Sequence, residues 1–160
     1  MGFQYDVKST HRSTSGVIVS SGRIRLKGGI VCPSVTTAAH MVFAENASTS
    51  GTYSQTTTTI TVTMTNTLAV GDRVWLDFTS GTAADAVYTV ATASSSQFTV
   101  TSGTSATTSG NVTMYATVLV EVDTTNATTF SFVVPGDGVL SENGLYVGMP
   151  STVTATAFYG

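Results

Sequence analysis

Side chains that could serve as nucleophiles, acid–base groups or metal ligands are sparse in this chain of 160 residues. There are two histidines, His11 in a polar stretch and His40 at the head of an apolar run, and neither has a cysteine or a second histidine nearby. Zinc sites combine several ligands at close spacing. The sequence therefore predicts no metal site at these histidines, and no catalytic residue or cofactor-binding residue.

The single cysteine, Cys32, closes an apolar run just before Pro33. One cysteine cannot form a disulfide within the chain. No basic residue adjoins it to favour the thiolate, so we expect a buried and unreactive thiol.

Two sets of carboxylates could bind a cation or act as an acid–base pair. Asp72, Asp77 and Asp85 could gather around calcium, but their spacing does not match an EF-hand loop. Glu121 and Asp123 lie two apart on one face of a predicted strand, with no second pair to suggest a glycosidase site. The chain is therefore predicted not to be an enzyme.

The sharpest functional candidate is a basic stripe formed by Arg23, Arg25 and Lys27. These residues alternate with Ile24 and Leu26, which predicts a strand with its basic side chains on the outer face. The stripe is interpreted either as protection of an edge strand or as a docking surface for an acidic partner. Nucleic acid is not the expected partner, because the net charge is −3 and no aromatic residues are interleaved with the bases.

A second candidate surface is aromatic. Trp75 and Tyr88, with Phe98, could form a platform that recognises a sugar. The alternative is that these rings belong to a hydrophobic core, and the alternation of Phe98 with Val100 favours the core.

Composition indicates the elements that must position these residues. Charged residues make up 9% of the chain, against about 25% in an average protein, and Thr, Ser and Gly take their place. Branched threonine suits a sheet, and no long segment has helical periodicity. We expect an all-β fold, with a β-sandwich or jelly-roll-like base domain and a small β-barrel or β-sandwich domain inserted in it. The low charge indicates either surface that is buried in an assembly or a small, rigid β protein.

Export and membrane signals are not found in the sequence. No apolar run reaches the roughly 20 residues that span a bilayer, and the chain does not open with a secretory segment. We therefore expect synthesis in a cytoplasm and no membrane partner.

The strand pattern predicts two domains. Residues 1–52 and 116–160 would form the base domain, and residues 53–115 a domain that projects from it. Alternating residues from 129 to 160 predict strands that pair with those between 16 and 44.

Turn chemistry sets the expected strand ends. Asn143-Gly144, between Leu140 and Leu145, predicts a β-hairpin. Gly28-Gly29 is expected to break a strand, and residues 1–15 to form a polar lead-in. Ser-Gly-Thr at residues 50–52 and 102–104 is expected to form turns, with a loop of small residues after the strand at 97–101.

Several motifs of the base resemble small virion proteins of tailed bacteriophages, notably marine and cyanobacterial short-tailed phages. The matching segments are residues 13–18 (STSGVI), 23–28 (RIRLKG), Phe43 before a Ser/Gly turn, 118–123 (VLVEVD), 135–140 (PGDGVL), 143–147 (NGLYV) and 158–160 (FYG). The insert resembles a module common in phage structural proteins. Its motif runs from Gly71 to Gly81 (GDRVWLDFTSG), before residues 88–90 (YTV) and 98–101 (FTVT).

This resemblance implies a component of a virus particle and brings no catalytic or cofactor residues with it. We expect a capsid decoration, or cement, protein on the outer capsid surface that binds the major capsid protein and forms a homo-oligomer, with a trimer favoured. The alternatives are a tail or tail-fibre adaptor that binds tail proteins, or a module that recognises host glycans through Trp75 and Tyr88.

Overall fold

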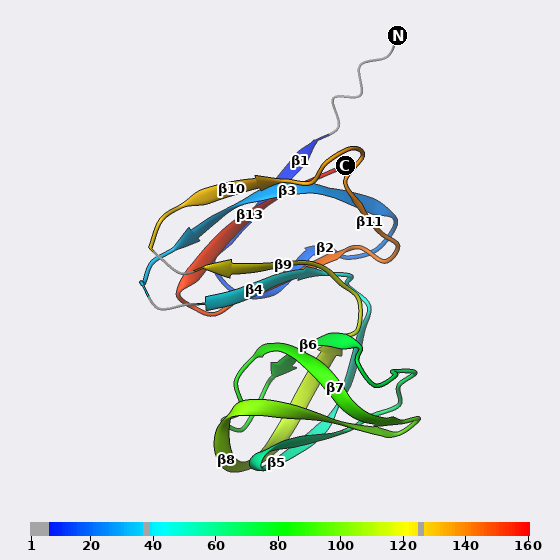
Figure 1. Ribbon diagram of the computed structural model, residues 1–160. Coiled ribbons are helices and arrows are strands. Elements are labelled where there is room, and N and C mark those ends of the chain that lie inside the picture. Colours follow the sequence, from blue (N-terminus) through cyan, green and yellow to red (C-terminus); the bar gives the residue numbers. More distant parts are fainter. Residues whose placement is uncertain (1–6, 37–38, 125–126) are drawn as a thin grey trace. The chain divides into compact units, whose positions relative to one another are not determined.

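The computed structural model describes residues 7–36, 39–124 and 127–160, and every regular element among them is a β-strand (Figure 1). The all-β fold predicted from composition is thereby confirmed. The strands are β1 (Lys8–Arg12), β2 (Gly16–Val19), β3 (Ile24–Pro33), β4 (Ala39–Ala44), β5 (Ser48–Thr63), β6 (Arg73–Phe78), β7 (Ala86–Ser94), β8 (Gln97–Tyr115), β9 (Val118–Thr124), β10 (Phe130–Val133), β11 (Val139–Ser141), β12 (Leu145–Gly148) and β13 (Val153–Tyr159).

The chain divides into two compact units. Unit 1 combines Met1–Asn46 with Leu119–Gly160, and unit 2 is the continuous segment Ala47–Val118. The sequence places these boundaries at 52/53 and 115/116, whereas the structure places them at 46/47 and 118/119.

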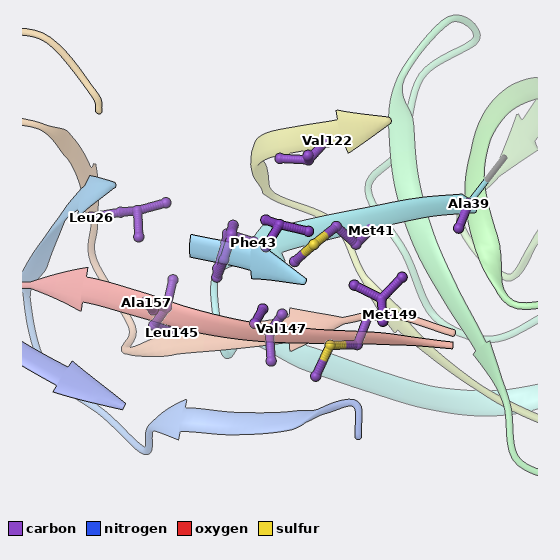
Figure 2. Packing of buried hydrophobic residues seen from close by; sticks show 12 residues of the cluster. Leu26, Ala39, Met41, Phe43, Val122, Leu145, Val147, Met149 and Ala157 are labelled. Atoms are coloured by element: carbon purple, nitrogen blue, oxygen red, sulfur yellow. The ribbon is translucent and has the colours of Figure 1, made fainter. Parts of the chain in front are cut away.

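Unit 1 is a sandwich of two sheets with one apolar core. Sheet A has the strand order β1-β13-β3-β10, with β11 also paired to β3, and sheet B has the order β2-β12-β4-β9. Figure 1 shows the two sheets facing each other within this unit. Buried side chains from both sheets form one cluster (Figure 2): Leu26, Val31, Ala39, Met41, Phe43, Val122, Leu145, Val147, Met149, Val153, Ala155 and Ala157. Complete burial of a leucine or valine stabilises the fold by about 1.5–3 kcal/mol.

The last strand, β13, lies inside sheet A between β1 and β3. Val153, Ala155 and Ala157 point into the core and are at most 2% exposed, whereas Thr154 and Thr156 on the opposite face are partly exposed. β12 likewise pairs with β2 and β4. The predicted pairing of the C-terminal strands with those between residues 16 and 44 is confirmed.

Strand β3 runs through Gly28-Gly29, so the predicted break there is wrong. Its register with β13 shifts at this point, because Phe158 pairs with Gly28 and Tyr159 pairs with Leu26. Gly28 has a φ of 154°, and a Cβ there would lie 2.4 Å from the carbonyl oxygen of Phe132. Glycine therefore allows close strand packing and a bulge at this point.

The polar lead-in also contains a strand. Among its described residues, Lys8–Arg12 form β1, which pairs with β13 at the edge of sheet A. Strand pairing depends on backbone hydrogen bonds, which polar residues form as well as apolar residues do. The hydroxyls of Thr10 and Tyr159 are hydrogen bonded over 3.0 Å.

The hairpin predicted at Asn143-Gly144 is wrong. β11 pairs with β3 in sheet A, whereas β12 pairs with β2 and β4 in sheet B. The turn therefore carries the chain from one sheet of the sandwich to the other. Gly144 has a φ of 76°, and its N–H donates to the carbonyl oxygen of Gly22 over 2.8 Å.

Unit 2 is built from sheet C, with the order β5-β8-β6-β7 and a further pairing of β7 with β8. Because β6, β7 and β8 each pair with the other two, the sheet closes on itself as a small barrel. This outcome agrees with the barrel alternative for the insert. Its core includes Ile60, Val62, Val74, Phe98 and Val100.

The turns expected at residues 50–52 and 102–104 are wrong, because both segments lie within the long strands β5 and β8. These strands pair from Ser48 opposite Tyr115 to Thr63 opposite Gln97, with a register shift between Thr57 and Thr59. Small residues suit this pairing. The backbone N–H and C=O groups of each strand are hydrogen bonded to those of the other, and small side chains do not obstruct the strands. At Gly51 a Cβ would lie 2.3 Å from the carbonyl oxygen of Thr63.

Candidate functional site

The basic stripe lies on an interior strand. β3 pairs with β13 on one side and with β10 and β11 on the other. An interior strand has no free edge to protect, so the edge-protection interpretation is wrong.

Two residues of the stripe hold the turn between β10 and β11. Lys27 Nζ donates to the carbonyl oxygen of Asp137 over 2.6 Å, and Arg25 Nη1 donates to the carbonyl oxygen of Gly138 over 3.2 Å. The backbone continues the contact, because the N–H of Val134 donates to the carbonyl oxygen of Lys27 over 2.9 Å. These side chains therefore stabilise unit 1 directly.

Arg23, just before β3, differs from the other two residues because its side chain is 68% exposed. Its Nε forms an ion pair of 2.9 Å with Glu142 Oε2. The backbone N–H of Glu142 donates to the carboxylate of Glu45, a residue that is 9% exposed. Glu142 thus connects an exposed cation to a largely buried carboxylate.

A shallow hollow of about 390 Å³ adjoins the stripe. Arg23, Ile24, Arg25, Leu140 and Gly160 line it. Its walls combine two guanidinium-bearing residues with two apolar side chains, which suits a contact with an acidic and partly apolar segment of another protein.

The aromatic residues of unit 2 are buried. Trp75 is 1% exposed and Tyr88 is 7% exposed. The hydroxyl of Tyr88 donates to the carbonyl oxygen of Ala84 over 2.7 Å, and its ring packs edge-on against Phe78. Burial raises the pKa of the Tyr88 phenol, and the Asp85 carboxylate adds to the rise. A sugar platform needs exposed ring faces, and neither ring provides one.

Two of the three aspartates considered for calcium accept hydrogen bonds from separate parts of the backbone. Asp72 Oδ2 accepts a hydrogen bond from the N–H of Ala69 over 2.8 Å, and Asp85 Oδ1 accepts one from Phe78 over 2.7 Å. Burial raises the pKa of Asp85; the Phe78 hydrogen bond opposes this rise and the nearby Asp77 carboxylate adds to it. In the described part of the chain, these three carboxylates do not form a cluster with the spacing of metal ligands.

Among the described residues, the outer face of sheet A is charged only at Arg25 and Lys27, which flank the buried Leu26 at the start of β3, and the rest of this face carries no Asp, Glu, Lys or Arg. The register places ten residues on this uncharged part: Ser9, His11, Gly28, Ile30, Cys32, Ser131, Val133, Thr154, Thr156 and Phe158. Val133 is 81% exposed. Cys32 is partly exposed here and pairs with Thr154, so the expectation of a buried thiol is wrong.

The structure also forms a cluster that the sequence does not predict. His40 lies on β4, Glu121 and Asp123 lie on the neighbouring strand β9, and all three are exposed. One donor atom from each residue lies within 4.8 Å of the other two. His40 Nδ1 is hydrogen bonded to Asp123 Oδ1, and Thr124 Oγ1 donates to the carbonyl oxygen of Ala39 over 3.3 Å.

The sequence does contain a signal for this cluster. β4 and β9 are the strands that flank unit 2, and strands that flank an inserted unit are brought together when the ends of the insert meet. His40 has no ligand nearby along the chain, but Glu121 and Asp123 become its neighbours once these two strands pair.

Fold and contacts together define a two-unit, all-β protein with a discontinuous sandwich and a continuous barrel. No family model matches the chain, and no curated protein matches it. Within the described ranges, no helix has the length and apolar character needed to cross a membrane.

Proposed function

We propose that this chain is a non-enzymatic structural protein of a bacteriophage virion, and that it decorates the outer surface of the capsid. Motifs in both units support this proposal by their resemblance to phage structural proteins. A decoration protein strengthens a coat lattice by burying surface across neighbouring subunits, and it needs no catalytic group.

The observation that carries the proposal is the uncharged part of the outer face of sheet A, away from Arg25 and Lys27. Protein interfaces are depleted of charged residues at their centres. The face combines apolar residues such as Ile30 and Phe158 with the hydroxyls of Thr154 and Thr156. Its proposed occupant is a second copy of the chain, in a closed homotrimer that matches a symmetric position on the capsid.

The proposed contact with the coat protein uses the exposed Arg23 and the hollow beside it. Arg25 and Lys27 also add positive charge on this side of unit 1, although they hold the turn at residues 137 and 138. An acidic patch of the major capsid protein would complement this charge.

The copy number in purified particles tests the proposal against its alternative. Quantitative mass spectrometry should give a number comparable to that of the coat protein. A number comparable to that of the tail proteins would instead support a tail or tail-fibre adaptor.

The trimer is tested separately in solution. The wild-type chain should have the mass of a trimer by light scattering, and Thr156→Lys should give a monomer because it places a charge within the uncharged part of the face. Thr101→Lys, an exposed change in unit 2, should leave the trimer intact. A wild-type monomer, or a trimer that tolerates Thr156→Lys, would contradict this assignment of the interface.

A further inference from the structure

We propose that His40, Glu121 and Asp123 form a binding site for a divalent transition-metal ion, with zinc as the ion that best suits the donors. This site lies on sheet B and does not depend on the proposed role in a virion.

Strand pairing places the donors together. Glu121 and Asp123 are two residues apart on β9, so their side chains lie on one face at a spacing of about 7 Å along the strand. His40 projects beside them from β4 and contacts Asp123 directly. The three donor atoms lie within 4.8 Å of one another, so small side-chain movements bring all three onto one ion.

The donor types select the class of metal. Two carboxylates alone would suit calcium or magnesium, which prefer oxygen ligands. The imidazole changes this preference, because nitrogen ligands suit zinc and its neighbours in the first transition row. One nitrogen and two carboxylate oxygens supply three ligands, and water or a group from another molecule would complete the tetrahedral set of zinc.

The strands also reduce the cost of assembling the site. Both carboxylates belong to one strand and the imidazole to its neighbour, so binding orders side chains but leaves the backbone in place. All three side chains are exposed, which gives an ion direct access.

Isothermal titration of the full chain with zinc chloride tests the proposal. The expected result is one site per chain, and His40→Gln, Glu121→Gln and Asp123→Asn should each weaken binding by about tenfold or more. Zinc should raise the thermal unfolding midpoint of the wild-type chain, and this rise should be lost in His40→Gln. Because the substituted side chains are exposed, the variants should retain the wild-type circular dichroism spectrum.

His11→Gln is the matched control. His11 is also exposed, but its Nδ1 lies 3.1 Å from the hydroxyl of Thr156, and it is not a member of the cluster. This variant should bind zinc like the wild type, and calcium at the same concentration should not displace zinc. Unchanged affinity in His40→Gln, an equal loss in His11→Gln, or displacement of zinc by calcium would overturn the assignment.

Discussion

Lys27 Nζ donates a hydrogen bond of 2.6 Å to the carbonyl oxygen of Asp137, which joins β3 to the turn between β10 and β11. Both strands that flank this turn pair with β3. β3 therefore pairs with β10 and β11 through its backbone, and its side chains hold the turn that connects these two strands. Lys27 and Arg25 therefore contribute to folding, whatever partner they meet outside the chain.

Replacement of Lys27 by methionine should lower the free energy of unfolding of unit 1 by about 1 kcal/mol, because it removes the donor to Asp137 and keeps most of the apolar stem. Urea denaturation measures the change. Lys8→Met is the control, since Lys8 is an exposed residue of the edge strand β1, and its cost should stay within about 0.5 kcal/mol. Equal costs for the two variants would contradict a stabilising role for the Lys27 contact.

Gly144→Ala should destabilise unit 1 more than Gly22→Ala. Both glycines have positive φ, 76° and 90°, so both substitutions introduce backbone strain of about 1 kcal/mol. A Cβ at Gly144 would lie 2.3 Å from the carbonyl oxygen of Val19, whereas a Cβ at Gly22 would meet nothing within 4 Å. The difference between the thermal unfolding midpoints of the two variants measures the cost of the steric clash at Gly144. Similar losses would show that the turn between the sheets is not constrained in this way.

Asp85→Asn should change how the stability of unit 2 depends on pH. Burial raises the pKa of Asp85 above 3.8, so the folded state binds this proton more tightly than the unfolded state does. As the pH falls from 7 through the folded-state pKa of Asp85, this residue therefore increases the free energy of unfolding of unit 2. The increase is complete below pH 3.8, where the residue is protonated in both states.

Urea denaturation at pH 7 and pH 4 tests this dependence. The wild type should gain stability relative to Asp85→Asn at the lower pH. Asparagine keeps an oxygen that can accept the hydrogen bond from Phe78, so the comparison isolates the charge. An identical difference at both pH values would contradict the prediction.

Deletion of residues 154–160 should prevent folding of unit 1, whereas replacement of residues 47–118 by a short turn should not. The deletion removes Ala155 and Ala157 from the core and separates β1 from β3. The replacement joins β4 to β9, which are already neighbours. Soluble yield and amide dispersion in NMR spectra distinguish the outcomes. A folded deletion variant or an unfolded replacement variant would contradict the unit assignment.

Much of the fold could be predicted because alternation reports directly on which residues face a core. Alternation of Val153, Ala155 and Ala157 with threonines predicts the strand and its inner face, and the structure confirms both. Composition also predicts the all-β class correctly, because branched and hydroxyl side chains suit sheets.

The errors occur where backbone pairing outweighs local sequence. Asn143-Gly144 has the chemistry of a hairpin, but the partners of its flanking strands lie far along the chain in two different sheets. The Ser, Thr and Gly residues of β5 and β8 are typical of turns and loops. They form strands because the backbones of these two long segments are hydrogen bonded to each other. The cluster at His40 depends on the pairing of β4 with β9, which local patterns do not encode.

Cryo-electron microscopy of the whole virus particle tests the central proposal most directly. We predict density for this chain at symmetric positions on the outer capsid surface, with copies in contact through the outer face of sheet A and with Arg23 toward the coat protein. Density confined to the tail or its vertex, with none on the capsid lattice, would contradict the assignment as a decoration protein.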